Sequence, residues 1–329
     1  MNKSEELKMF KYIYGNCENW NVVPAESPDF VCVRNNKTVL GVEITELYPN
    51  ESDARLEKVS GYCLDLLDGK EVIHKDDKKN LRVERITYFK KDKSDGREIN
   101  AIIHEGISFG KKVSRFQEVV NRKEKKTNSY LSSCPIVDLI VNDASYMFRF
   151  DNYKDFVIPF SMLIDKATII ESGFREIYII TLHKNNKIVW IPLKLNLFAQ
   201  EIYIYEKLVA DLGKPKDDIK KFLNILLFCL YKSGFGSIPI IIENGNIGFF
   251  VGNSEYLYTK AGKIIREYST LPESVPSGKV LKEAIKKISD FEKEAANELI
   301  KEKQKWKCHV ELFFEPVIQS LFIKQCERP

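Results

Sequence analysis

The sequence predicts an α/β fold over residues 1–198, followed by an α+β domain over residues 199–329. In the first part, apolar residues at helical spacing alternate with short β-branched runs, and these runs form two hairpin patterns. From Leu195 onward the pattern changes to longer helical segments around a further hairpin. A chain of 329 residues suits two domains better than one.

The composition supports a packed core: 44% of residues are apolar and 12% are aromatic. The net charge of +4 is too small to indicate nucleic-acid binding by itself, so that argument depends on local clusters of charge. The seven cysteines are scattered and show no Cys-x-x-Cys spacing. They argue against a zinc site and against a disulfide framework, and they suit a reducing cytoplasm.

No sequence signal indicates a membrane or a secreted protein. The first residues lack the apolar core of a signal peptide, and the most apolar run, Phe222–Tyr231, is far short of the roughly 20 residues that span a bilayer. The four histidines are isolated, and neither a P-loop nor a Gly-x-Ser-x-Gly motif occurs. We therefore expect a soluble, cytoplasmic protein without membrane contact.

The stretch from Ser27 to Leu47 predicts a β-hairpin. Two β-branched runs flank the turn residues Asn35-Asn36-Lys37. Asp29 begins the first strand and Glu43 lies 14 residues later in the second, where strand pairing would bring the two carboxylates together. Such a pair suits a hard divalent cation such as Mg²⁺. In the alternative interpretation, both acids are solvated on an ordinary hairpin.

The other elements expected before residue 110 have less distinctive sequence patterns. We expect a first helix capped by Ser4, a loop over 16–24, and a second helix over 53–67. Residues 74–97 form a charged stretch with one strand at Leu81–Phe89. Arg55 and Lys58 of this helix lie just past the acidic hairpin in the sequence, and we expect them to be able to reach its acids.

A basic segment follows. Seven basic and two acidic residues lie between Lys111 and Lys126, and a helix over 119–130 would place Lys123, Lys126 and Tyr130 on one face. A short apolar strand at Ile136–Val141 comes next. An amphipathic helix with exposed lysines explains the same pattern without any site.

The remaining elements are a hairpin over 174–193, a helix over 217–231, a hairpin over 237–251 and a long mixed-charge helix over 279–307. The long helix is a packing surface or a contact with a protein partner or a second copy of the chain.

Pro28-Asp29, a short loop and Gly41-Val-Glu43-Ile-Thr45 resemble the PD-(D/E)xK nuclease superfamily. The resemblance covers residues 1–198 and implies a restriction-endonuclease-like fold, with a mixed central sheet flanked by helices. It implies that Asp29 and Glu43 bind Mg²⁺ or Mn²⁺, with the backbone carbonyl of Ile44 and the carboxylate of Glu6 as further ligands. The basic helix and the apolar strand after it also resemble the order of elements in divergent members.

The chain departs from the family at Thr45, which stands where the family has its lysine. We expect Thr45 to lie beside the metal, and Lys123 or Lys126 to supply the missing positive charge. A basic surface would hold the phosphate backbone. Its residues would be Lys111, Lys112, Arg115, Arg122 and Tyr130.

These observations predict a metal-dependent endonuclease, a hydrolase of phosphodiester bonds, with DNA favoured over RNA. The resemblance associates such proteins with anti-phage or restriction systems. The rival hypothesis is a catalytically inactive module that keeps the fold as a nucleic-acid-binding or scaffold subunit.

Overall fold

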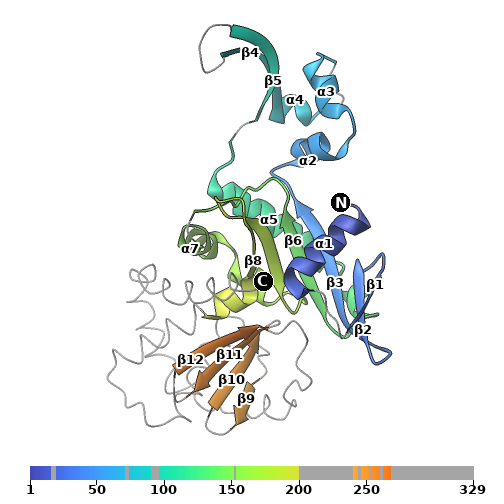
Figure 1. The fold of residues 1–329 in the computed structure, drawn as a ribbon, viewed down its shortest axis with the longest axis vertical. Helices are drawn as coiled ribbons and strands as arrows, with labels where there is room; N and C mark the ends of the chain where they lie inside the picture. The colour runs from blue at the N-terminus through green and yellow to red at the C-terminus, as the bar shows by residue number, and fades with distance from the viewer. Residues whose placement is uncertain are drawn as a thin grey trace, which may run out of the picture. The chain divides into compact units, whose positions relative to one another are not determined.

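The computed structural model describes residues 1–15, 20–70, 74–89, 96–104, 106–151, 153–199, 240–243, 246–251, 254–259 and 262–267 (Figure 1). The described residues fall into two compact units. One combines Met1–Glu46 with Gln117–Pro329, and the other is Leu47–Phe116. Within the described ranges, no helix combines the length and the apolar character needed to cross a membrane.

The first unit is built on a six-stranded mixed sheet with the order β1-β2-β3-β6-β7-β8. The β6 and β7 strands run parallel, whereas β1 with β2, β2 with β3, and β7 with β8 are antiparallel. The predicted mixed sheet flanked by helices is therefore confirmed at this level. The strands are β1 Asn21–Pro24, β2 Phe30–Arg34, β3 Lys37–Leu47, β6 Val137–Asp143, β7 Ile177–Leu182 and β8 Ile188–Pro192.

The hairpin predicted at 27–47 is formed by β2 and β3. Asn35 and Asn36 both adopt positive φ (51° and 59°), as a two-residue turn between right-twisted strands requires. Phe30 pairs with Val42, so the next pair along the register brings Asp29 alongside Glu43. The predicted loop over 16–24 is wrong in part, because Asn21–Pro24 pairs with β2 as an edge strand.

Helix α1 (Lys3–Tyr14) covers one face of this sheet (Figure 1). Its Phe10, Ile13 and Tyr14 are buried in one core with Val42 and Ile44 of β3. Because side chains alternate along a strand, Glu43 and Thr45 project from the opposite face.

The predicted cap of α1 at Ser4 is wrong, because the helix begins two residues earlier than that cap requires. Asn2 accepts a hydrogen bond from the Glu5 backbone N–H, and the Glu5 carboxylate accepts one from the backbone N–H of Asn2. This reciprocal pair satisfies two backbone donors at once. It uses Glu5, so Glu6 is the acid of this turn that remains for other contacts.

Two helices lie on the sheet face that carries Glu43: α5 (Phe109–Glu124) and α6 (Thr127–Leu131). The single helix predicted over 119–130 is therefore wrong. The Lys126 N–H bonds to the Lys123 carbonyl three residues back, which tightens the last turn, and the chain restarts as α6. Helices α7 (Tyr153–Leu163) and α8 (Lys166–Ile170) precede β7 in the chain. The hairpin predicted over 174–193 is confirmed, because β7 and β8 pair antiparallel.

The second unit, Leu47–Phe116, contains α2 (Glu51–Lys58), α3 (Tyr62–Leu67), α4 (Asp77–Asn80) and a two-stranded ribbon of β4 (Leu81–Phe89) and β5 (Gly96–His104). The β4 strand was predicted, and β5 was not. The single helix expected over 53–67 is wrong. Gly61, at a left-handed φ of 78°, separates α2 from α3.

A buried carboxylate, Asp77, organises the polar interior of this unit. It accepts hydrogen bonds from the Arg55 guanidinium and the Tyr62 hydroxyl. Burial raises the pKa of Asp77, but hydrogen bonds from Arg55, Ser52 and Tyr62 outweigh it and lower the value to about 2. Arg55 is thus held by Asp77, and Lys58 lies over the Tyr48 ring, so the idea that these cations serve Asp29 and Glu43 gains no support.

In the C-terminal part, the described residues form a four-stranded antiparallel sheet. It contains β9 (Ile240–Glu243), β10 (Asn246–Val251), β11 (Ser254–Thr259) and β12 (Gly262–Glu267) in sequential order. The β9–β10 hairpin is the one predicted over 237–251. The helices predicted at 217–231 and 279–307 lie outside the described residues, and the domain boundary at residue 198 stays a prediction.

Candidate functional site

Asp29 precedes β2 and is held against β3 by its own carboxylate. Its Oδ2 accepts a hydrogen bond of 2.8 Å from the Ile44 backbone N–H, and its backbone carbonyl accepts one from Ala25. The Asp29 side chain is only 15% exposed. The hairpin therefore fixes the orientation of this carboxylate beside the Glu43 segment.

Glu43 lies in the middle of β3 and is almost completely buried, with 7% of its side chain exposed. Lys123, near the end of α5, places its Nζ 2.5 Å from Glu43 Oε1. The other oxygen, Oε2, is buried and has no hydrogen-bond partner. Because an unpaired buried carboxylate oxygen is costly, this atom would gain from a further hydrogen-bond donor or a cation.

Tyr130 of α6 completes the surroundings of Glu43. Burial raises the pKa of the Tyr130 hydroxyl well above its usual value. The charge of Glu43 and a hydrogen bond to it, together with the charge of Asp29, act in the same direction. The phenol therefore stays protonated. Its ring packs against Phe174 at a centroid distance of 6.4 Å, which fixes its position.

Gly41 allows the segments around the site to approach closely. Its backbone N–H donates to the Ile136 carbonyl at 2.9 Å. A Cβ at this position would lie 2.8 Å from Pro28 Cγ and 2.9 Å from Cys134 Sγ. Only glycine lets β3 pass between the residue before Asp29 and the segment after α6.

A second lysine lies at the site, and sequence reasoning missed it. Lys3, at the start of α1, places its Nζ 3.1 Å from Asp29 Oδ1 and 3.0 Å from Glu6 Oε2, and it donates to the Ala25 carbonyl at 2.8 Å. Burial lowers the pKa of Lys3, but hydrogen bonds and charges from Glu6 and Asp29 outweigh it and raise the pKa. The only sequence signal was the i, i+3 spacing of Lys3 and Glu6.

The structure thus brings together several predicted residues. Asp29, Glu43, Lys123 and Tyr130 share one region, and Glu6 joins them through Lys3. Thr45 is 8% exposed and, by strand alternation, lies on the Glu43 side of β3.

Other predicted residues lie elsewhere. Lys126 is exposed at the start of α6, so the shared helical face with Lys123 and Tyr130 does not exist. Tyr130 is 1% exposed, which is incompatible with the expected surface contact to nucleic acid. Arg115 bonds the Tyr48 carbonyl and Glu51.

Of the cations predicted for the basic surface, Lys111 and Arg122 are exposed on α5, whereas Lys112 and Arg115 are partly exposed.

The electrostatic balance leaves an excess of negative charge. The carboxylates of Glu6, Asp29 and Glu43 face two ammonium groups, Lys3 and Lys123, so the formal sum is −1. Across the described residues, no group of three or more His, Cys, Asp and Glu side chains is arranged to hold a metal ion. Each carboxylate is paired with a lysine instead. The donor chemistry still fits Mg²⁺ or Mn²⁺, because all candidate ligands are hard oxygens and Glu43 Oε2 lacks a partner.

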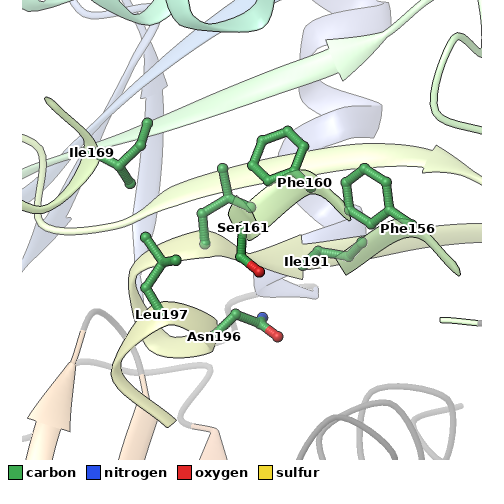
Figure 2. A pocket seen from close by; sticks show the side chains of 8 residues that line it. Phe156, Phe160, Ser161, Ile169, Ile191, Asn196 and Leu197 are labelled. Carbon is green, nitrogen blue, oxygen red and sulfur yellow. The ribbon is translucent and has the colours of Figure 1, made fainter. Parts of the chain in front are cut away.

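Two other features do not resemble a catalytic site. Asp138 is buried and bound by Arg175 and the Tyr14 hydroxyl, which ties α1 to the sheet. The pocket in Figure 2 is lined by side chains from α7, α8, β8 and the residues after β8; they are mainly apolar, with no acid, base or thiol among them. Its lining residues are Phe156, Phe160, Ser161, Ile169, Ile191, Leu193, Asn196 and Leu197.

Comparisons with family models, with curated proteins and with solved structures find no match for this chain.

Proposed function

We propose that this chain is a metal-dependent nuclease that hydrolyses phosphodiester bonds, with DNA as the expected substrate. The observation that carries the proposal is the buried Glu43 carboxylate beside Asp29. One of its oxygens is paired with Lys123 and the other has no partner.

Asp29 and Glu43 are the residues that would hold Mg²⁺ or Mn²⁺, with the Ile44 carbonyl and Glu6 as predicted further ligands. The bound ion would supply charge stabilisation and a more acidic water. The Ile44 N–H keeps the Asp29 carboxylate in place before any ion arrives. This orientation lowers the reorganisation needed for binding.

Lys123 takes the role predicted for the lysine that Thr45 replaces. Its ammonium already reaches Glu43, so a phosphate held at these acids would lie within its reach. There it would offset the negative charge that develops on the phosphoryl oxygens as the new P–O bond forms and the leaving P–O bond breaks. The hydroxyl of Tyr130, which stays protonated, would hold Glu43 in position.

Substrate binding would depend on phosphate contacts rather than on base reading. Lys111 and Arg122 are exposed cations on the helix that carries Lys123, and Lys112 is partly exposed. A role in an anti-phage or restriction system follows only from the family resemblance.

One observation favours the rival function, a catalytically inactive binding or scaffold subunit. Both carboxylates have lysine partners, Asp29 with Lys3 and Glu43 with Lys123. These two ion pairs would also stabilise the packing of α1 and α5 against the hairpin in a protein that binds no metal.

The two functions are separated by plasmid cleavage with Mg²⁺ or Mn²⁺. Wild type is compared with Glu43→Gln, which keeps the side-chain shape, and with Glu57→Gln, a matched exposed acid on α2. We expect nicking by wild type and Glu57→Gln and a loss of at least about a hundredfold in Glu43→Gln. Equal cleavage by Glu43→Gln, or no cleavage by any purified wild-type preparation, would favour the scaffold.

A further inference from the structure

The Lys3 ammonium, in the first turn of α1, is surrounded by oxygen atoms. Three oxygens surround its Nζ: Ala25 O at 2.8 Å, Glu6 Oε2 at 3.0 Å and Asp29 Oδ1 at 3.1 Å. They come from three segments, namely the loop before β2, α1 and the start of the hairpin. The side chain also passes over the Phe30 ring, with Nζ 5.7 Å from the centroid.

Two carboxylates and one backbone carbonyl form the same donor set that hard divalent cations select. The Lys3 ammonium donates hydrogen bonds to the Ala25 carbonyl and to Asp29 Oδ1 and forms an ion pair with Glu6 Oε2, so these oxygens suit an ammonium in this structure. Asp29 belongs to this group through Oδ1, while its Oδ2 is held by the Ile44 N–H toward β3. Asp29 also links this group to the Glu43 segment of β3, where Glu43 Oε2 is buried and has no hydrogen-bond partner, which suits a cation at the acids of the hairpin.

We infer that the Lys3 ammonium is a built-in second cation, which fills an oxygen-lined position on Asp29 and restricts the acidic site to a single divalent ion. The inference rests on the proposed function for the first ion, at Asp29 and Glu43. It adds that Lys3 fills the neighbouring position where many phosphodiester-cleaving sites carry a second metal. Glu6 then acts as the partner of Lys3 rather than as a ligand of the first ion.

The physical argument is one of charge. With Lys3 in place, Glu6 and Asp29 carry one neutralising charge between them, and a divalent ion added there would lie against an ammonium. Removing the ammonium leaves two carboxylates and a carbonyl without a cation, and their mutual repulsion favours an ion from solution. Because the Lys3 side chain is 41% exposed, solvent ions reach this position.

The test is the number of Mn²⁺ ions bound per chain, measured by calorimetric titration and by the loss of the free-ion electron paramagnetic resonance signal. Wild type is compared with Lys3→Met, which removes the charge and keeps the length, and with Lys3→Arg, which keeps the charge. Lys8→Met, an exposed lysine of the same helix, is the matched control. Lys3→Gln serves as a second neutral variant if Lys3→Met does not fold.

We expect the count to rise from about one to about two Mn²⁺ ions in the neutral variants, and to stay unchanged in Lys3→Arg and Lys8→Met. Adding Glu6→Gln to Lys3→Met should abolish the gain. If neither neutral variant binds more Mn²⁺ than wild type, the inference is overturned. If wild type binds none and Lys3→Met binds one, the first-ion site of the proposed function fails while the Lys3 position stands.

Discussion

Replacement of Lys123 by methionine is the sharpest test of the site, because it removes one charge from a nearly buried pair. The Lys123 side chain is 17% exposed and the Glu43 side chain 7%, with 2.5 Å between Nζ and Oε1. Methionine keeps most of the aliphatic stem that packs beside β3. The change therefore isolates the ammonium.

The magnitude follows from burial. Removing one partner of a buried ion pair typically costs 3–5 kcal/mol, because the remaining charge loses its compensation. We expect about 3 kcal/mol less free energy of unfolding for Lys123→Met, the lower end of that range, since Tyr130 still faces Glu43. The double variant Lys123→Met/Glu43→Gln removes both charges and should recover about 2 kcal/mol of the loss.

Urea unfolding at neutral pH, with chelator present, measures these free energies. Lys126→Met is the matched control because Lys126 is exposed, and it should stay within about 0.5 kcal/mol of wild type. Saturating Mg²⁺ should restore part of the stability of Lys123→Met, because the ion binds only the folded state. A Lys123→Met loss no larger than that of Lys126→Met would refute the view that Glu43 is a buried charge held by Lys123.

Three further predictions concern single positions. Gly41→Ala should lower the free energy of unfolding by about 1–3 kcal/mol in the same urea assay, because its Cβ would lie 2.9 Å from Cys134 Sγ. Gly106→Ala is the control and should be nearly neutral, because a Cβ there would meet nothing within 4 Å. Asp77→Asn should destabilise the chain by about 3 kcal/mol at pH 7. Since the folded pKa of Asp77 is lowered to about 2, its contribution is present above the unfolded value of about 4 and is lost as pH falls toward 2, so the wild-type and Asp77→Asn unfolding midpoints should converge there. Thr45→Lys should slow plasmid cleavage by at least about tenfold and weaken Mn²⁺ binding, because a second ammonium near Lys123 would repel the ion. Faster cleavage by this variant would mean that Lys123 does not take the role of the family's lysine.

Much of the fold could be predicted from local patterns. The 27–47 hairpin depends on Asn35 and Asn36, which adopt positive φ readily, and on β-branched runs at either side. The β7–β8 and β9–β10 hairpins were likewise predicted from β-branched runs on either side of polar turn sequences, and both pairings are present. The misplaced helix ends have a common cause, because helix boundaries depend on capping contacts such as that of Asn2 and on breaks such as Gly61, which periodicity does not reveal.

By itself, the sequence determined the mixed α/β character of residues 1–198 and the pairing of Asp29 with Glu43, since two-strand register is a local property. Which cations meet these acids was decided only by tertiary structure. Lys123 lies 80 residues from Glu43 in the sequence, and Lys3 lies 26 residues from Asp29. Each lysine reaches its acid only because its helix packs against the sheet. The helical period suggested Lys126 and Tyr130 as equals of Lys123. The break before α6 left Lys126 exposed and buried Tyr130 against Glu43, because long-range burial overrides a local periodic pattern.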